Sequence, residues 1–160
     1  MAEEPKGLRP IRNAITPGEP PKLVAFSGGF DPLHSGHVAR IEAATYYGPV
    51  LIILNSDDWL IRKKGFYYQN WEQRARVMRA LGLVRGVVAV DDSDDTVCRA
   101  LVEHQPRYFV NGGDRNAGNI PETFLCKRLG IECLYGIGDE HGVHGALMAA
   151  KSIVKREWGT

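Results

Sequence analysis

Short apolar runs alternate with longer segments of mixed polarity along most of this chain. The apolar runs have the length of buried strands, and we expect strands at residues 23–26, 50–54, 87–90, 108–110 and 133–135. The intervening segments have the length of helices, which we expect at residues 36–47, 70–81, 95–104, 121–129 and 143–158. Strands that alternate with helices predict βαβ units. The predicted fold class is therefore α/β, an open parallel sheet of about five strands with helices on both faces.

The first 22 residues differ in character from the rest. They have few apolar residues and contain Pro5, Pro10, Pro17, Pro20 and Pro21. Such a segment cannot bury enough apolar surface to offset the conformational freedom lost on ordering. We therefore expect residues 1–22 to form a flexible N-terminal arm. Residues 23–160 are expected to form one domain, since a chain of this size supports a single hydrophobic core.

The overall composition changes this picture little. The 160-residue chain has a formal net charge of +1, with 44% hydrophobic and 24% charged residues. We expect neither nucleic acid nor membrane as a partner, so any anion site must be local. No apolar run approaches the roughly 20 residues that cross a bilayer, and the N-terminus lacks an apolar signal core. These features predict a cytoplasmic protein.

The cysteines do not suggest a metal or disulfide framework. Cys98, Cys126 and Cys133 are odd in number and include no C-x-x-C pair. We expect them to be buried or incidental thiols.

The segment after the first predicted strand carries the clearest chemistry. It reads Ser27-Gly28-Gly29-Phe30-Asp31-Pro32-Leu33-His34-Ser35-Gly36-His37, and the next helix is expected to begin near its end. Paired glycines allow close approach of the backbone to a ligand and positive φ angles. A helix N-terminus offers free N–H groups to phosphate, and two histidines three residues apart lie on the same side of its first turn. Two plainer interpretations remain, a glycine-rich turn with ordinary histidines and a pair of metal ligands.

This string resembles the signature of the HxGH nucleotidyltransferase superfamily and its cytidylyltransferase-like family. Members include glycerol-3-phosphate cytidylyltransferases and heptose-phosphate adenylyltransferases. The resemblance implies a Rossmann-like fold and an enzyme that transfers AMP or CMP from ATP or CTP to a phosphorylated small molecule, with release of pyrophosphate. It implies a sugar or polyol phosphate as acceptor and Mg²⁺ bound with the triphosphate. Dimers are common among similar enzymes, so a homodimer is a further expectation.

The resemblance assigns roles to residues in the first three loops. Catalytic roles fall to His34, His37, Lys64 and Arg74. Arg74 lies in the stretch Glu72-Gln73-Arg74, similar to the family's E-x-R, and is expected to bind phosphate through its guanidinium fork. Nucleotide-binding roles fall to Ser27, Gly28, Gly29, Phe30, Asp31, Gly36, Asn55 and Lys63. Lys64 is favoured over Lys63 because it precedes Gly65, and the plainer interpretation is that residues 62–64 form a solvated basic patch.

Two later segments complete the predicted site. The stretch Asn111-Gly112-Gly113-Asp114-Arg115 resembles the K-G-G-D-Y or N-G-G-D-R segment of similar adenylyltransferases, which implies that it holds the nucleoside. Asp91, Asp92, Asp94 and Asp95 form an acidic cluster. We interpret it through Asp94 or Asp95 capping the helix expected near Thr96, and a metal site is the alternative.

One segment departs from the family pattern. Similar enzymes end with a loop rich in serine and threonine that binds the β- and γ-phosphates, whereas residues 138–147 contain no hydroxyl side chain. Backbone amides with His144 could bind the triphosphate instead. Alternatively, His141 and His144 could hold a divalent metal with the first two histidines, or the chain could bind nucleotide and turn over poorly. A nucleotide-binding regulatory module with weakened catalysis is therefore the alternative function.

Overall fold

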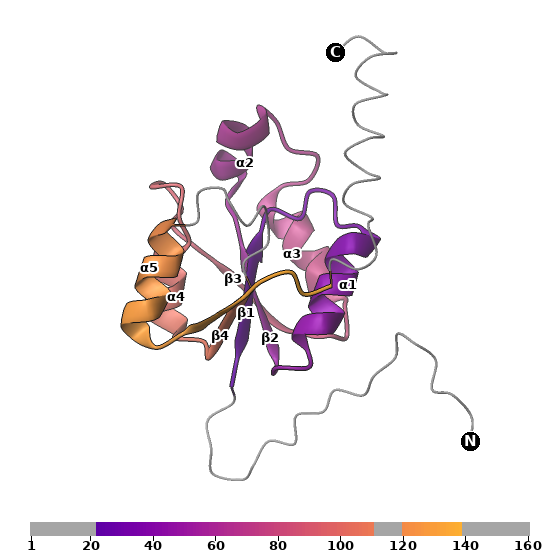
Figure 1. The fold of residues 1–160 in the computed structure, drawn as a ribbon. Coiled ribbons are helices and arrows are strands. Elements are labelled where there is room, and N and C mark those ends of the chain that lie inside the picture. Colours follow the sequence, from indigo (N-terminus) through magenta and orange to yellow (C-terminus); the bar gives the residue numbers. More distant parts are fainter. Residues whose placement is uncertain (1–21, 111–119, 139–160) are drawn as a thin grey trace, which may run out of the picture.

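The fold is an open sheet of parallel strands (Figure 1). The computed structural model describes residues 22–110 and 120–138. The sheet contains five strands in the order β3-β2-β1-β4-β5, and every neighbouring pair is parallel. The strands are β1 (Val24–Gly28), β2 (Val50–Leu54), β3 (Val84–Ala89), β4 (Tyr108–Val110) and β5 (Glu132–Leu134). The predicted α/β class, with a Rossmann-like parallel sheet, is confirmed.

Helices cover both faces of this sheet (Figure 1). They are α1 (Ser35–Ala44), α2 (Asp57–Lys64), α3 (Trp71–Arg79), α4 (Cys98–His104) and α5 (Ile120–Leu129). Side chains alternate along β1, so that Val24 and Phe26 pack in the core shared with α1 and α3. Ala25 packs in the other core, which α4 and α5 cover.

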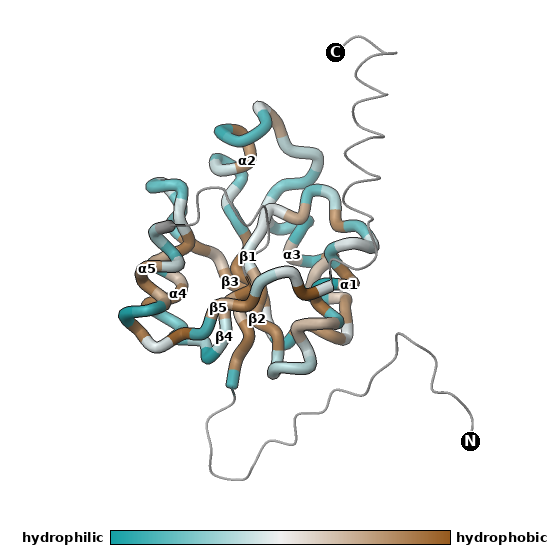
Figure 2. Tube along the Cα trace, viewed as in Figure 1, coloured by the Kyte–Doolittle hydropathy of each residue, from teal (hydrophilic) through white to brown (hydrophobic). Residues whose placement is uncertain are grey.

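The sheet interior is apolar and the connections are mostly polar. Figure 2 shows hydrophobic residues along the central strands, while α2 and several loop tips are hydrophilic. All of β2 is buried, as expected for a central parallel strand that has helices on both sides. No helix within residues 22–110 and 120–138 is long and apolar enough to span a membrane.

The strand order locates the place where a ligand is expected. The connection from β1 leads through α1 to β2 on one side, whereas β4 leads through α5 to β5 on the other. Adjacent strands whose connections leave in opposite directions form a crevice at their carboxyl ends, which is where open α/β sheets bind ligands. The segment that follows β1 therefore lies at this crevice.

One helix was absent from our predictions. Residues 55–65 were expected to be a loop, but Asp57–Lys64 forms α2. The signals were present in the sequence. The Ser56 side chain caps the helix by accepting from the N–H of Trp59, and Gly65 ends it with φ 83°. Asp57 and Asp58 in the first turn and a basic last turn also suit the helix dipole.

Within the described residues the other predicted elements exist, and most have shifted ends. The third strand begins at Val84, three residues earlier than the apolar run at 87–90 indicated, because it pairs with β2 from Val50 onward across a local shift in register. The helix expected at residues 95–104 begins at Cys98. The arm at residues 1–21, the helix expected at 143–158 and the segment 139–147 lie outside the described residues.

Candidate active site

Two histidines build the beginning of α1. His34 is the N-cap residue, and its Nδ1 accepts from the N–H of Gly36 at 3.1 Å. The Nδ1 of His37 accepts from the N–H of His34 at 3.3 Å, which closes a capping box in which both members are histidines. The rings stack with centroids 3.6 Å apart and an angle of 22° between their planes.

These contacts fix the tautomer of each ring. A neutral imidazole carries its proton on one nitrogen, and the nitrogen that accepts a hydrogen bond cannot be the one that donates. Since Nδ1 is the acceptor in both His34 and His37, both neutral rings carry the proton on Nε2. The start of α1 therefore places two imidazole N–H groups at the positive end of the helix dipole, a set of donors suited to phosphate oxygens.

Phe30 orients the second histidine. Its buried ring meets the ring of His37 edge-on, with centroids 4.9 Å apart and an angle of 80°. Phe30 also packs edge-on against Phe26 in the core, with centroids 5.3 Å apart. The catalytic candidate is thus supported from the sheet by two aromatic rings.

The paired glycines act differently from our prediction. Neither Gly28 nor Gly29 has a positive φ angle. The residue with positive φ in this segment is Phe30, at 48°. The glycines make room for neighbouring side chains, because a Cβ on Gly29 would lie 2.6 Å from the Leu60 side chain and one on Gly28 would lie 3.0 Å from the Phe30 ring, so these side chains would have to shift. The absence of Cβ atoms lets α2 and the Phe30 ring approach the backbone.

Asp31 joins this segment to the chain beyond α2. Its fully buried carboxylate accepts from the N–H groups of Tyr68 and Gln69 at 2.7 and 2.9 Å. The Lys64 ammonium lies 3.3 Å from the same carboxylate and donates to the Asp31 carbonyl at 2.6 Å. Burial alone would raise the pKa of Asp31, but the two N–H donors and the ammonium outweigh it and hold the pKa below its usual value.

Arg74 lies at the centre of three loops rather than on their surface. Its side chain is fully buried, and Nη1 donates to the carbonyls of Gly29 and Asn55, both at 2.9 Å. Nε donates to the carbonyl of Gln69, and Nη2 pairs with the Asp57 carboxylate at 2.6 Å. The expected direct contact with phosphate does not fit this arrangement. Arg74 instead holds together the segments that surround the site, which makes it a positioning residue.

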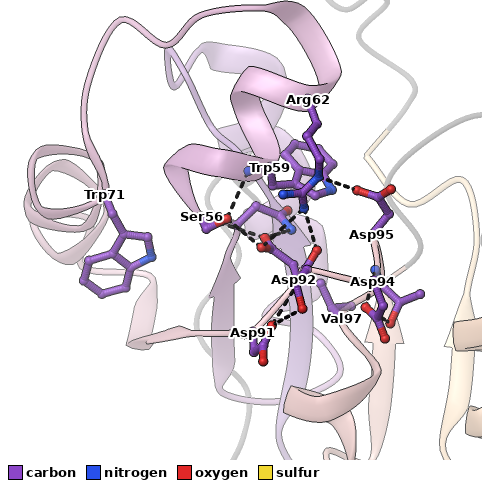
Figure 3. Close-up of polar contacts among 12 residues, drawn as sticks. Ser56, Trp59, Arg62, Trp71, Asp91, Asp92, Asp94, Asp95 and Val97 are labelled. Carbon is purple, nitrogen blue, oxygen red and sulfur yellow. Dashed lines mark hydrogen bonds and ion pairs between the residues drawn. The ribbon is translucent and has the colours of Figure 1, made fainter.

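Asn55 is likewise occupied by the protein. It is buried, and its Nδ2 donates to the Asp92 carboxylate at 3.0 Å. The same carboxylate accepts from the N–H and the hydroxyl of Ser56 at 2.9 and 2.6 Å (Figure 3). Asp92 therefore fixes the beginning of α2. Sequence reasoning missed this role, and its signal was an aspartate two residues after a predicted strand.

The remaining members of the acidic cluster also bind nearby groups. Asp95 pairs with Nε of Arg62 at 2.9 Å, which holds Arg62 against the loop after β3 (Figure 3). Asp94 accepts from the N–H of Thr96, and this hydrogen bond lowers the pKa of Asp94. The expected cap is wrong, because α4 begins at Cys98 with Val97 as its N-cap residue, and its first N–H groups donate to Thr96 and Glu122 instead.

The basic residues of α2 divide into different roles. Arg62 is bound to the loop after β3, and Lys64 to Asp31. Lys63 is exposed, and its ammonium lies 5.6 Å from the centroid of the Trp59 ring. Of the two predicted phosphate ligands, the structure brings Lys64 to the segment after β1.

Two further predictions lie partly outside the described residues. Asn111, Gly112, Gly113, Asp114 and Arg115, together with His141 and His144, fall in segments that the structure does not describe. Within residues 22–110 and 120–138, no group of three histidine, cysteine, aspartate or glutamate side chains could hold a metal ion. Gly138, the last residue described before the segment with His141 and His144, lies against α1. A Cβ there would lie 2.7 Å from the Cα of Arg40.

Comparisons with known proteins agree with this geometry. A Streptomyces coelicolor protein named bifunctional protein HldE is 40% identical over 111 residues, which cover 68% of this chain and 24% of that protein. A Bordetella bronchiseptica protein named D-beta-D-heptose 1-phosphate adenylyltransferase is 32% identical over 122 residues, which cover 73% of this chain and 74% of that protein. The chain thus spans about a quarter of the length of the bifunctional relative.

A solved structure shares the fold. The lipopolysaccharide core biosynthesis protein from Thermoplasma volcanium superposes with a TM-score of 0.62 at 18% sequence identity, covering 72% of this chain and 94% of that chain. In addition, the family model described as cytidylyltransferase-like matches residues 25–125, well over half of the sequence. This chain therefore belongs to the cytidylyltransferase-like family of nucleotidyltransferases.

Proposed function

We propose that this protein transfers AMP from ATP to a sugar phosphate and releases pyrophosphate. The observation that carries the proposal is the start of α1, where the Nδ1 atoms of His34 and His37 both accept backbone N–H groups and leave the ring protons on Nε2. This set of donors follows the central strand at the crevice where the connections diverge. The names of the relatives, an adenylyltransferase acting on heptose 1-phosphate among them, support a sugar phosphate acceptor and ATP as donor.

The reaction is an in-line substitution at phosphorus. An oxygen of the acceptor phosphate attacks the α-phosphorus of ATP, a new P–O bond forms, and the bond to the pyrophosphate oxygen breaks. Negative charge builds on the transferred group and on the departing pyrophosphate, so positioning and charge stabilisation supply most of the catalysis. In our proposal His34 and His37 donate to that group, and the α1 N-terminus adds the partial positive charge of its helix dipole.

The neighbouring residues hold this arrangement in place. Lys64 places a positive charge beside the segment after β1, anchored on Asp31. Arg74 ties the carbonyls of Gly29 and Asn55 together and so fixes the distance between the first two loops. We assign Arg74 to positioning, and Lys64 to neutralising phosphate charge beside the segment after β1.

Mg²⁺ is part of the proposal as a companion of the triphosphate. It prefers water and phosphate oxygens to an all-protein cage, and the donor groups in the described part of the chain form no such cage. When bound with ATP it would neutralise charge on the phosphates. We also propose that residues 111–115 hold the nucleoside and that His144 contributes to triphosphate binding.

Pyrophosphate release tests the function directly. The purified protein is incubated with Mg²⁺, with ATP or CTP, and with D-β-D-heptose 1-phosphate, glucose 1-phosphate or glycerol 3-phosphate. We expect release with ATP and a sugar phosphate, at a higher kcat/KM than with CTP or glycerol 3-phosphate. Nucleotide binding without release from any pair would instead favour the regulatory module, to which the enzyme names of the relatives lend no support.

A variant of His37 tests the catalytic assignment. Removing one donor that stabilises the transition state typically lowers kcat by about 100- to 1000-fold, and we expect this for His37→Ala. His104→Ala is the matched control, because His104 is a partly exposed histidine at the end of α4, away from the candidate site. Its Nε2 lies 3.9 Å from the Glu103 carboxylate. Circular dichroism checks that both variants fold. Unchanged turnover in folded His37→Ala would refute the assignment.

A further inference from the structure

The connection between α2 and α3 presents aromatic rings to solvent beside the candidate active site. Phe66, Tyr67 and Tyr68 are 48%, 40% and 66% exposed. In Figure 1, α2 and this connection stand above the carboxyl-terminal edge of the sheet. Consecutive aromatic residues left in solvent beside a candidate site indicate a surface that a ligand covers.

This connection is firmly anchored. The N–H groups of Tyr68 and Gln69 both donate to the buried Asp31 carboxylate, and the carbonyl of Gln69 accepts from Arg74. Asp31 lies only three residues before His34. The exposed rings are therefore held in a fixed relation to the segment that carries the catalytic histidines.

Two of the rings form a corner around a positive charge. The rings of Phe66 and Tyr68 are nearly perpendicular, at 87°, with centroids 5.1 Å apart. The ammonium of Lys64 lies 5.4 Å from the first centroid and 5.5 Å from the second. We call the set of Phe66, Tyr68 and Lys64 the aromatic corner. Its Lys64 side chain is 28% exposed.

We propose that the aromatic corner is the subsite for the acceptor, and that it selects a phosphorylated sugar. This inference rests on the proposed function and names the part of the site that holds the second substrate. The face of an aromatic ring is electron-rich, so it attracts the polarised C–H groups of a sugar ring, while the sugar hydroxyls remain in water. The ammonium of Lys64 attracts the phosphate of the same molecule, which directs it toward the segment after β1.

The topology favours the acceptor over the nucleotide base as occupant. The crevice formed by diverging connections lies between β1 and β4, and the nucleotide is expected there. The aromatic corner belongs to the connection between β2 and β3, on the opposite side of β1. A molecule held there would approach the α-phosphorus from a side that the nucleoside does not occupy, and in-line attack requires that the departing pyrophosphate lie opposite it.

Variants that remove a ring but keep apolar volume test the subsite. Phe66→Leu and Tyr68→Leu are each expected to weaken binding of D-β-D-heptose 1-phosphate about fivefold to tenfold, measured by calorimetry. In kinetics the KM for this acceptor should rise by the same factor, with the KM for ATP changed less than about twofold. Tyr68→Phe keeps the ring and should restore wild-type values. Phe124→Leu, which removes an exposed ring on α5, is the matched control and should change nothing.

The calorimetry separates this inference from the proposed function. If the wild type releases no pyrophosphate with any sugar phosphate, the proposed function fails, and the binding data alone then decide the subsite. Failure of the wild type to bind the sugar phosphate, or equal binding by the leucine variants, would overturn the subsite. It would also be overturned by a rise in the KM for ATP alone, which would mean that the corner holds the base. Sedimentation that shows loss of a dimer in Phe66→Leu, with unchanged acceptor affinity, would assign the corner to a subunit contact.

Discussion

Two regions of the molecule are held together by different means: the loops that follow β1, β2 and β3, and the core under α4 and α5. Within the described residues, the loops at the carboxyl ends of β1, β2 and β3 enclose buried charged side chains, including Asp31, Arg74 and Asp92. The core under α4 and α5 packs mainly through apolar side chains and the thiol of Cys126. There the buried carboxylate of Glu122 accepts from the N–H of Val97.

This difference separates the site from the scaffold. Hydrogen bonds to buried charges have narrow geometry, so they fix the positions of loops that a catalytic site needs. Apolar packing tolerates small shifts and mainly supplies stability. The comparison predicts that removing a buried charge from the loops after β1, β2 and β3 lowers stability more than changing a polar group on the surface. It also predicts that the thiols in the core under α4 and α5 are inert.

The largest effect on stability is expected at Arg74. Arg74→Leu leaves three carbonyls and the Asp57 carboxylate without their partner, so the free energy of unfolding should fall by about 3–5 kcal/mol. Arg76→Leu, an exposed change in the same helix, should alter it by less than about 0.5 kcal/mol. Urea denaturation measures both. Equal losses of stability in the two variants would show that the hydrogen bonds of buried Arg74 add no measurable stability.

The thiol of Cys126 provides the opposite case. Burial, with the neighbouring Cys133 thiol as a smaller cause, raises the pKa of Cys126 to about 12. Because the thiolate is the reactive form, iodoacetamide at pH 8 should label Cys126 at least about 100-fold more slowly in the native protein than in urea. Peptide mapping by mass spectrometry follows the label. Rapid native labelling would show that α5 opens easily and that the core under α4 and α5 is loosely packed.

Asp92 sharpens the comparison within the acidic cluster. Asp92→Ala leaves the buried amide of Asn55 and the N–H of Ser56 without an acceptor, at a cost of about 2–3 kcal/mol. Asp91→Ala removes exposed contacts with Ser93 and Arg99, and should cost less than Asp92→Ala. Thermal unfolding distinguishes the two variants. A smaller loss for Asp92 than for Asp91 would remove Asp92 from the positioning network.

The smallest expected effect depends on pH. The pKa of Asp31 in the folded protein lies below the usual value of 3.8, so folding favours the ionised carboxylate. This stability is fully present above the unfolded pKa and is lost as pH falls through the folded one. Asp31→Asn should therefore be less stable by about 1–2 kcal/mol at pH 7, and the difference should shrink below about pH 4. Urea denaturation from pH 7 to pH 3 measures this, with Asp58→Asn as the exposed control. A constant difference across that range would contradict the assignment.

Predictions from sequence succeeded where local pattern decides structure. The apolar runs located all five strands of the sheet, and β2 and β4 have the predicted bounds. The resemblance of residues 27–37 to a known signature placed His34 and His37 at a helix start, where the structure has them. Predictions failed where the hydrogen-bond partners of a residue are distant from it in sequence. Arg74 was expected to face phosphate, but its partners are carbonyls up to 45 residues away.

The sequence by itself determined the alternation of strands and helices, the family, and the segment that we propose as the site. These depend on short-range periodicity and on neighbouring residues, which are visible in any single chain. Tertiary structure alone decided which charged groups are buried together. Asp31 meets Tyr68, and Asn55 meets Asp92, only because parallel strands bring their carboxyl ends to one edge. A buried charge must find a partner, and the fold, not the local sequence, determines which one is within reach.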